Sequence, residues 1–104
     1  MILDIGCGDL PGNRILNSDG IDMFDYGQRY QFNIEETFPW PIQDDLYDEV
    51  VALHILEHIK DGYAFIRILN EIWRVSKNGA IFRGACPHFP SSQTIIETQL
   101  TVGS

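Results

Sequence analysis

The sequence predicts an α/β fold in which helices flank a mostly parallel β-sheet. Short apolar runs alternate with loops in the order strand, glycine-rich loop, further strands, amphipathic helix and strand. Glycine, acidic and histidine residues stand directly after several of these runs, where the carboxyl ends of parallel strands bind ligands. With 104 residues, the chain is expected to form one domain over residues 1–104 with a modest hydrophobic core.

Four segments before the helix are predicted to be strands because they are short, apolar and bounded by turn residues. They cover residues 2–5, 20–24, 30–34 and 49–56. The segment EVVALHIL (49–56) is the longest run rich in β-branched residues and is expected to be buried. Two prolines in FPWPI (38–42) exclude a central strand or a helix there, so Trp40 is expected to be a packing residue.

One amphipathic helix is predicted over residues 61–77, with Asp61 as its N-cap and Asn78-Gly79 as its C-terminal stop. The apolar stripe comprises Phe65, Ile68, Leu69, Ile72, Trp73 and Val75. The opposite, solvated face comprises Arg67, Asn70, Glu71, Arg74 and Lys77. A strand over residues 80–86 is predicted next, and residues 91–104 form a tail with only a weak apolar pattern.

Composition and charge narrow the classes of partner and compartment. The net charge of −8 argues against a nucleic acid as the main partner, because an anionic surface repels phosphates. No apolar run approaches the roughly 18 residues that span a bilayer, and the chain shows no signal peptide. The two cysteines, Cys7 and Cys86, are expected to be buried, reduced thiols. These features together predict a cytoplasmic protein with no membrane partner.

The segment LDIGCGDLPG, residues 3–12, places two glycines directly after the first strand. Gly6 and Gly8 can adopt positive φ and let backbone N–H groups approach a ligand, although their spacing differs from the dinucleotide fingerprint. Asp22 closes the second strand 14 residues after Gly8, where a carboxylate can accept both hydroxyl groups of a ribose. The structural alternative is a strand-ending turn followed by an aspartate that caps another turn.

Five motifs in order carry a resemblance that covers roughly residues 2–90. They are LDIGCG, GIDM, FNIEETFPWPI, YDEVVALHILEHI and NEIWRVSKNGAIFRGACPHF. This order resembles class I S-adenosylmethionine-dependent methyltransferases, of the type 11-like subgroup with a shortened first crossover. The resemblance implies a Rossmann-like sheet, S-adenosylmethionine as the cofactor, and transfer of its methyl group to a small-molecule acceptor.

The resemblance also implies which residues bind the cofactor. They are Asp4, Gly6, Gly8, Asp22, Met23, Asn33, Ile34, Leu53 and His54. By this resemblance Asp4 positions the methionine amino group, and the two glycines pass beneath the cofactor. Asp22 binds the ribose, Met23 packs on the adenine, and Asn33-Ile34 holds the adenine edge. Leu53 and His54 then lie near the methionine end.

The chain departs from the family pattern at three points. Leu10 replaces the usual third glycine, and Asn33 replaces the usual acid at the adenine. The complete family fold has two more strands after the fifth, so the resemblance implies a shortened member that lacks them. An alternative function follows, in which the chain is a non-catalytic domain that binds a cofactor or a protein partner. An exposed fifth strand at residues 80–86 then invites a homo-oligomer.

A methyl group on a sulfonium is already electrophilic, so catalysis is mainly alignment of the acceptor. A base is needed only for a protonated acceptor, and His88 and His58 are the candidates for it. No metal is predicted for this chemistry. The segment HILEH (54–58) also matches an inverted zinc-protease signature, which gives a zinc hydrolase as a remote alternative. The candidates for its third ligand are Glu71 and Glu97, the only later glutamates.

Overall fold

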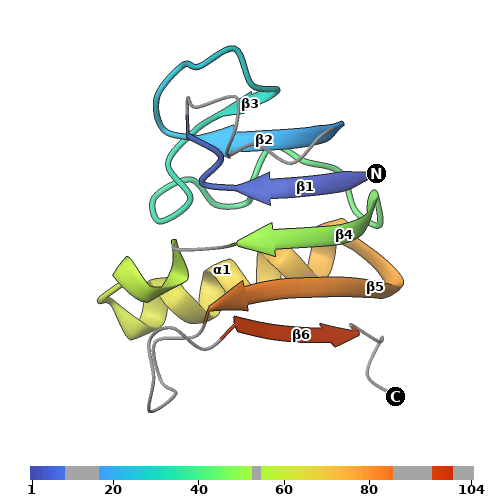
Figure 1. Cartoon of the computed structure of the whole chain (residues 1–104). Coiled ribbons are helices and arrows are strands. Elements are labelled where there is room, and N and C mark those ends of the chain that lie inside the picture. The colour runs from blue at the N-terminus through green and yellow to red at the C-terminus, as the bar shows by residue number, and fades with distance from the viewer. Residues whose placement is uncertain (9–16, 53–54, 86–94, 100–104) are drawn as a thin grey trace.

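A computed structural model describes residues 1–8, 17–52, 55–85 and 95–99, which form one six-stranded sheet and a long helix (Figure 1). The strands are β1 (Ile2–Ile5), β2 (Ser18–Asp22), β3 (Tyr30–Gln31), β4 (Tyr47–Ala52), β5 (Ser76–Ala85) and β6 (Ile95–Gln99). The helices are the 3-10 turn η2 (Leu56–His58) and α1 (Gly62–Val75). The strand order is β3-β2-β1-β4-β5-β6.

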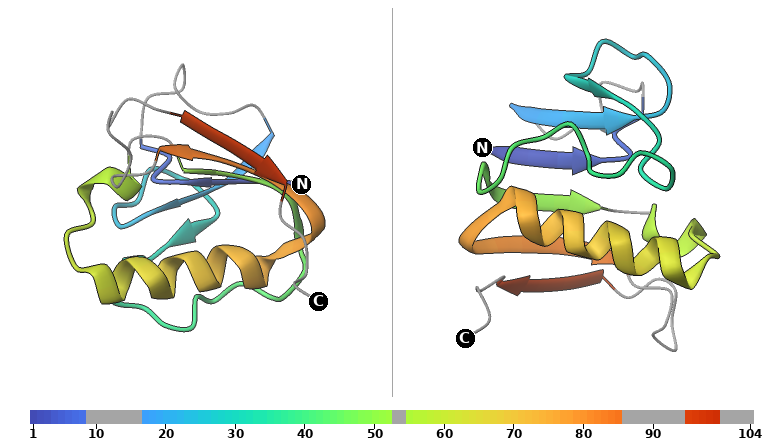
Figure 2. Two further views of the ribbon diagram at one scale, coloured as in Figure 1. Left: turned by 90° about the horizontal axis from the view of Figure 1, so that it is seen from below. Right: turned by 180° about the vertical axis from the view of Figure 1, so that it is seen from behind.

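The first five strands are parallel, and β6 alone runs antiparallel to its neighbour β5. The predicted α/β class with a mostly parallel sheet is therefore confirmed. Figure 2 shows α1 lying along one face of the sheet. Within the described ranges α1 is the one α-helix, so the flanking helices that the sequence predicts are represented by a single layer.

The hydrophobic core lies between α1 and the sheet face that α1 covers. Its strand residues include Leu3, Ile5, Ile21 and Val50, each with no exposed surface. Trp40 is 2% exposed and packs against Phe32 with ring centroids 5.8 Å apart. The prediction that Trp40 is a packing residue is confirmed. Cys7 is buried as predicted, whereas Cys86 lies outside the described residues.

Helix α1 begins where predicted, because the Asp61 side chain accepts a hydrogen bond from the Tyr63 backbone N–H at 3.0 Å. The buried side chains are Ala64, Phe65, Ile68, Glu71, Ile72 and Val75. The prediction that Glu71 is solvated is therefore wrong, and so is the placement of Leu69 and Trp73 on the buried stripe. These two are 39% and 43% exposed, because each lies about 100° around the helix from a core-facing neighbour.

The end of α1 differs from the prediction. The helix ends at Val75, and Ser76 passes directly into β5, where it pairs with Tyr47. The register then shifts so that Glu49 pairs with Ile81, and Gly79 has a φ of 86° within this irregular stretch. The helix therefore ends three residues before the expected Asn-Gly stop, because Ser76 already pairs with β4, and Gly79 lies within the register shift of β5.

The prediction of an exposed edge at residues 80–86 is wrong, because β6 pairs with β5. Ile81 pairs with Gln99 at one end of this ladder, and Ala85 pairs with Ile95 at the other. Part of the tail expected to lack a pattern thus forms the sixth strand. A homo-oligomer through an open fifth strand loses its structural premise, since the β5 edge is already occupied. Among the described residues, no helix is both long enough and apolar enough to cross a membrane.

Candidate functional site

The ends of β1, β2 and β3 surround a pocket of about 310 Å³. This edge is where an open parallel sheet binds its ligand, and the volume lies at the low end for small-molecule sites. The lining comes from the turn after β1, the loops after β2 and β3, and the segment around η2. It comprises Gly6, Ile21, Asp22, Met23, Phe24, Tyr26, Phe32, Asn33, Ile34, Glu35, Ile55, His58 and Ile59.

The glycine turn after β1 has the conformation expected from its sequence. Gly6 and Gly8 have φ values of 72° and 68°, and the Gly6 N–H donates to the Ile21 carbonyl at 2.8 Å. A Cβ on Gly6 would lie 3.0 Å from the Cδ1 atom of Ile55, which also lines the pocket. Gly6 therefore supplies both the left-handed turn and the close approach of the chain that follows β4.

Asp22 is the charged residue that joins the two turns. Its Oδ2 atom accepts the Gly8 N–H at 3.1 Å, and its Oδ1 atom accepts the Phe24 N–H at 3.1 Å. A carboxylate offers about four lone-pair sites, so each oxygen retains capacity for another donor. Asp22 therefore caps a turn, as the structural alternative expected. Its carboxylate can still accept hydrogen bonds from a vicinal diol at the pocket.

The opposite wall is formed by the loop after β3. Asn33 begins this loop, because its Oδ1 atom accepts the Glu35 N–H at 2.9 Å and its backbone carbonyl accepts the Thr37 N–H at 3.0 Å. The amide oxygen of Asn33 therefore already accepts one hydrogen bond, so a ligand would meet its second lone pair or its Nδ2 group. Glu35 lines the same wall, and sequence reasoning missed it because the resemblance assigned the adenine edge to Asn33 and Ile34 alone.

The structure brings six of the predicted site residues to one pocket: Gly6, Asp22, Met23, Asn33, Ile34 and His58. Asp4 and Gly8 do not line it. Asp4 is buried in β1 and pairs with Gly20, while Gly8 contributes through its hydrogen bond to Asp22. Leu53, His54 and His88 lie outside the described residues. Two exposed aromatic residues at the pocket, Phe24 and Tyr26, had no signal in the motifs.

No group of three or more histidine, cysteine, aspartate or glutamate side chains could hold a metal ion within the part of the chain that the structure describes. The zinc alternative depends on His54, which is outside that part. Glu71, one of its two candidate third ligands, instead accepts hydrogen bonds from Trp40 and Arg74.

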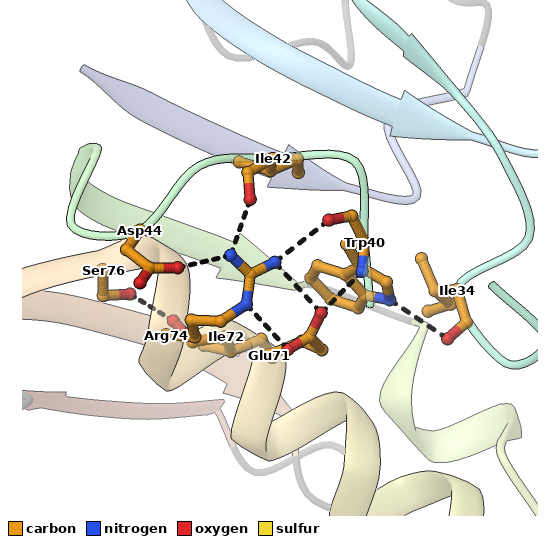
Figure 3. A network of polar contacts seen from close by, with 8 residues as sticks. All are labelled: Ile34, Trp40, Ile42, Asp44, Glu71, Ile72, Arg74 and Ser76. Atoms are coloured by element: carbon orange, nitrogen blue, oxygen red, sulfur yellow. Dashed lines mark hydrogen bonds and ion pairs between the residues drawn. The ribbon is translucent and has the colours of Figure 1, made fainter. Parts of the chain in front are cut away.

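A polar network joins helix α1 to the chain around Trp40 and reaches Ile34, which lines the pocket (Figure 3). The Trp40 indole N–H donates to the Ile34 carbonyl at 3.3 Å, and the Trp40 backbone N–H donates to Glu71 at 2.6 Å. Arg74 donates to Glu71 at 2.9 Å and to the Trp40 carbonyl at 3.0 Å. This network ties the loop that carries Ile34 to helix α1.

The network also sets the charge states of its members. Burial alone raises the pKa of Glu71, but hydrogen bonds from Arg74 and from the Trp40 N–H outweigh burial and lower this pKa below the ordinary 4.5. The hydrogen bond to Glu71 raises the pKa of Arg74 above its usual range, against the opposing effect of burial. Both groups are therefore charged at neutral pH, and their attraction holds the segment in place.

No protein-family model matches the chain, and no curated protein matches it. Solved structures do match. A SAM-dependent methyltransferase from Methanosarcina mazei has a TM-score of 0.62 and 24% identity, over 80% of this chain and 50% of that protein. A candidate S-adenosyl-L-methionine-dependent methyltransferase from Methanococcus maripaludis has a TM-score of 0.57 and 18% identity, over 82% of this chain and 47% of that protein.

A third match is the [4+2]-cyclase SpnF. Its TM-score is 0.58 with 20% identity, over 80% of this chain and 37% of that protein. The chain thus spans half or less of the length of these three proteins. The likeness shows a methyltransferase-like Rossmann fold that covers part of the full domain.

Proposed function

We propose that the pocket binds S-adenosylmethionine and that the chain carries the cofactor-binding part of a methyltransferase. One observation carries this proposal: the Asp22 carboxylate is fixed by the N–H groups of Gly8 and Phe24 at the end of β2, on the lining of the pocket. A carboxylate held in this way is preorganised to accept the two hydroxyl groups of a ribose, without reorganising when the ligand arrives.

The remaining lining fits the other parts of the cofactor. Met23 and Ile34 offer apolar surface for a flat base, and Asn33 and Glu35 offer polar groups for its edge. Gly6 lines the pocket in a left-handed conformation, so its main chain is the part that would meet the extended amino-acid part of the ligand. Asp4, Gly8, Leu53 and His54 retain their proposed roles from the resemblance.

S-adenosylmethionine supplies a methyl group that is already activated for attack. The residues of this chain then have to hold the cofactor, exclude water and align an acceptor, which we propose is a small molecule. His58 lines the pocket and is the described residue that could take a proton from the acceptor; His88 is proposed for the same role from its sequence position.

The second candidate function is cofactor binding without methyl transfer. SpnF shares the fold and is named for a cyclisation, so the fold is compatible with more than one chemistry. The chain also spans about half of the matched methyltransferase from Methanosarcina mazei. Both observations favour testing binding before turnover.

The first experiment is calorimetric titration of the folded chain with S-adenosylmethionine and S-adenosylhomocysteine. We expect saturable micromolar binding that Asp22→Ala weakens about tenfold or more, because hydrogen bonds to a charged group contribute about 1.5–3 kcal/mol. Asp25→Ala is the matched control, since Asp25 accepts the Gly27 N–H in the same loop and does not line the pocket. Absence of binding by a folded wild-type chain rejects the proposal.

Methyl transfer is tested next with cofactor carrying a labelled methyl group and a panel of small amine, thiol, hydroxyl and carboxylate acceptors. Formation of labelled product and S-adenosylhomocysteine supports the methyltransferase. Binding without product for any acceptor class favours the non-catalytic candidate. Full turnover by both His58→Ala and His88→Ala removes these histidines from the reaction.

A further inference from the structure

The wall of the pocket formed by the loop between β2 and β3 is unusual in how it is held. Met23, Phe24 and Tyr26 line the pocket from this loop, and all three are exposed to solvent. They do not belong to the hydrophobic core, so core packing does not fix their position. Another set of contacts has to define the shape of this wall.

The side chain of Gln28 provides several of those contacts, in addition to the hydrogen bond from the Phe24 N–H to Asp22. Its Nε2 group lies 3.3, 2.7 and 3.0 Å from the carbonyl oxygens of Asp22, Phe24 and Tyr30. Because this group has two N–H bonds, one of them is shared between two of these acceptors. Its Oε1 atom accepts the Tyr26 N–H at 2.7 Å. One amide thus joins four points of the backbone on both sides of the loop. Only this orientation of the amide works, because the reverse would set an oxygen against three carbonyl oxygens.

The stem of Gln28 is anchored on the sheet as well. A Cβ on Gly20 of β2 would lie 3.0 Å from the Cβ of Gln28 and 2.6 Å from the Sγ of Cys7. Gln28 therefore rests on the main chain of β2, with the turn after β1 beside it. The amide and its stem together connect the exposed loop to the two strands that carry the glycine turn and Asp22.

We propose that Gln28 is a positioning residue that holds the Met23–Tyr26 wall in the conformation that binds the adenosine half of the ligand. This inference rests on the proposed function. An exposed loop without such a clamp has to be ordered when the ligand binds, and that ordering lowers affinity. Glutamate has the same length as glutamine but lacks both N–H groups. In Gln28→Glu a carboxylate oxygen faces three carbonyl oxygens, and their repulsion drives the whole group out of the loop, so the hydrogen bond from the Tyr26 N–H is lost as well.

The first test needs no ligand. Amide hydrogen exchange, followed by NMR, compares wild type, Gln28→Glu and the matched control Gln31→Glu. Gln31 is exposed, and its side chain donates a long hydrogen bond, 3.4 Å, to the Met23 carbonyl. We expect the Tyr26 amide to exchange at least about tenfold faster in Gln28→Glu alone, while the amide of Val50 in the core keeps its protection in all three. Equal exchange of the Tyr26 amide in all three proteins overturns the clamp.

The second test measures binding of S-adenosylhomocysteine and of methylthioadenosine, which lacks the amino-acid part. If Gln28 positions the adenosine wall, Gln28→Glu weakens both ligands by the same factor, about tenfold, and Gln31→Glu weakens neither. A loss for S-adenosylhomocysteine alone overturns the assignment to the adenosine half. Unchanged binding of both ligands by Gln28→Glu overturns the positioning role but leaves the proposed function intact. A wild type that binds neither ligand rejects the proposed function, and the positioning role with it.

Discussion

Arg74 and Glu71 form a bidentate ion pair on α1, with the Nε and Nη2 atoms of Arg74 at 2.9 and 3.0 Å from the two carboxylate oxygens (Figure 3). The same guanidinium donates to the carbonyl oxygens of Trp40 and Ile42 and to the carboxylate of Asp44. These acceptors lie in and just after the proline-containing segment 38–42, which is outside the helices and strands. Charge and hydrogen bonding, rather than regular backbone pairing, therefore hold this segment on the helix.

We expect Arg74→Ala to lower the free energy of unfolding by about 2–3 kcal/mol, because hydrogen bonds to charged groups contribute about 1.5–3 kcal/mol and Glu71 is left buried without its cation. Urea denaturation followed by tryptophan fluorescence measures this loss. Arg29→Ala is the control, since Arg29 is exposed and makes a 3.5 Å ion pair with Asp19, which predicts a loss below about 1 kcal/mol. Equal losses for the two variants would contradict the structural role of the network.

The lowered pKa of Glu71 makes the stability of this network depend on pH. A carboxyl group whose pKa is below 4.5 in the folded state contributes its stability above that pH. This contribution is lost as the pH falls through the folded pKa. The difference in unfolding free energy between wild type and Glu71→Gln should therefore be largest at pH 7 and shrink below pH 4.5. Urea denaturation at pH 7, 5 and 3.5 tests the sign, and a difference independent of pH contradicts it.

Two isoleucines of α1 lie on opposite faces of the helix, one buried and one exposed. Ile68 has no exposed surface, whereas Ile66 is 59% exposed. We expect Ile68→Ala to lower the free energy of unfolding by about 2–5 kcal/mol through loss of burial and a cavity. Ile66→Ala should change it by no more than about 0.5 kcal/mol. The substitution is the same on the same helix, so similar losses in urea denaturation would mean that the helix is rotated from the orientation described here.

Gly20 is required by the packing of β2 against Cys7. Because a Cβ there would lie 2.6 Å from the Cys7 Sγ, we expect Gly20→Ala to cost about 1–3 kcal/mol of unfolding free energy. Adding Cys7→Ala removes the sulfur and should recover part of this loss, with a coupling energy of about 0.5–3 kcal/mol in a double-mutant cycle. Gly62→Ala is the control, since a Cβ at Gly62 meets open space. Strict additivity would contradict the contact.

The elements that the sequence predicted well are those in which local and tertiary signals agree. The apolar segment Ile2–Ile5 forms the strand with its expected bounds, and Asp61 caps the helix. The glycine turn and Asp22 meet at one pocket because the ends of neighbouring parallel strands share an edge. That argument needs only the strand order, so it does not depend on errors of two residues at strand ends.

The features that the sequence did not predict depend on partners far along the chain. Glu71 is charged and sits among polar neighbours in the sequence, and its burial follows from Trp40, which is 31 positions away. Strand β6 is held by backbone pairing with β5, and backbone groups leave no side-chain pattern. The clamp at Gln28 is likewise invisible in the sequence, because its acceptors are carbonyl oxygens of the main chain.

Glu35 gives the sharpest prediction about ligand recognition. Under the proposed binding mode its carboxylate accepts a hydrogen bond from the exocyclic amine of adenine. This role is open because Asn33 stands where the family usually has an acid. Replacing that amine with the carbonyl oxygen of hypoxanthine sets oxygen against oxygen. Wild type should therefore bind S-adenosylhomocysteine about tenfold or more tightly than S-inosylhomocysteine, in line with a difference of about 1.4 kcal/mol.

Glu35→Gln should reduce this preference, because an amide can donate to the hypoxanthine carbonyl as well as accept from the amine. Glu36→Gln is the control, since Glu36 is exposed and does not line the pocket. Calorimetric titration of both ligands into the three proteins measures the ratio directly. An unchanged ratio in Glu35→Gln would assign recognition of the amine to Asn33 instead. Its amide oxygen would then have to accept both the Glu35 N–H, at 2.9 Å, and the ligand.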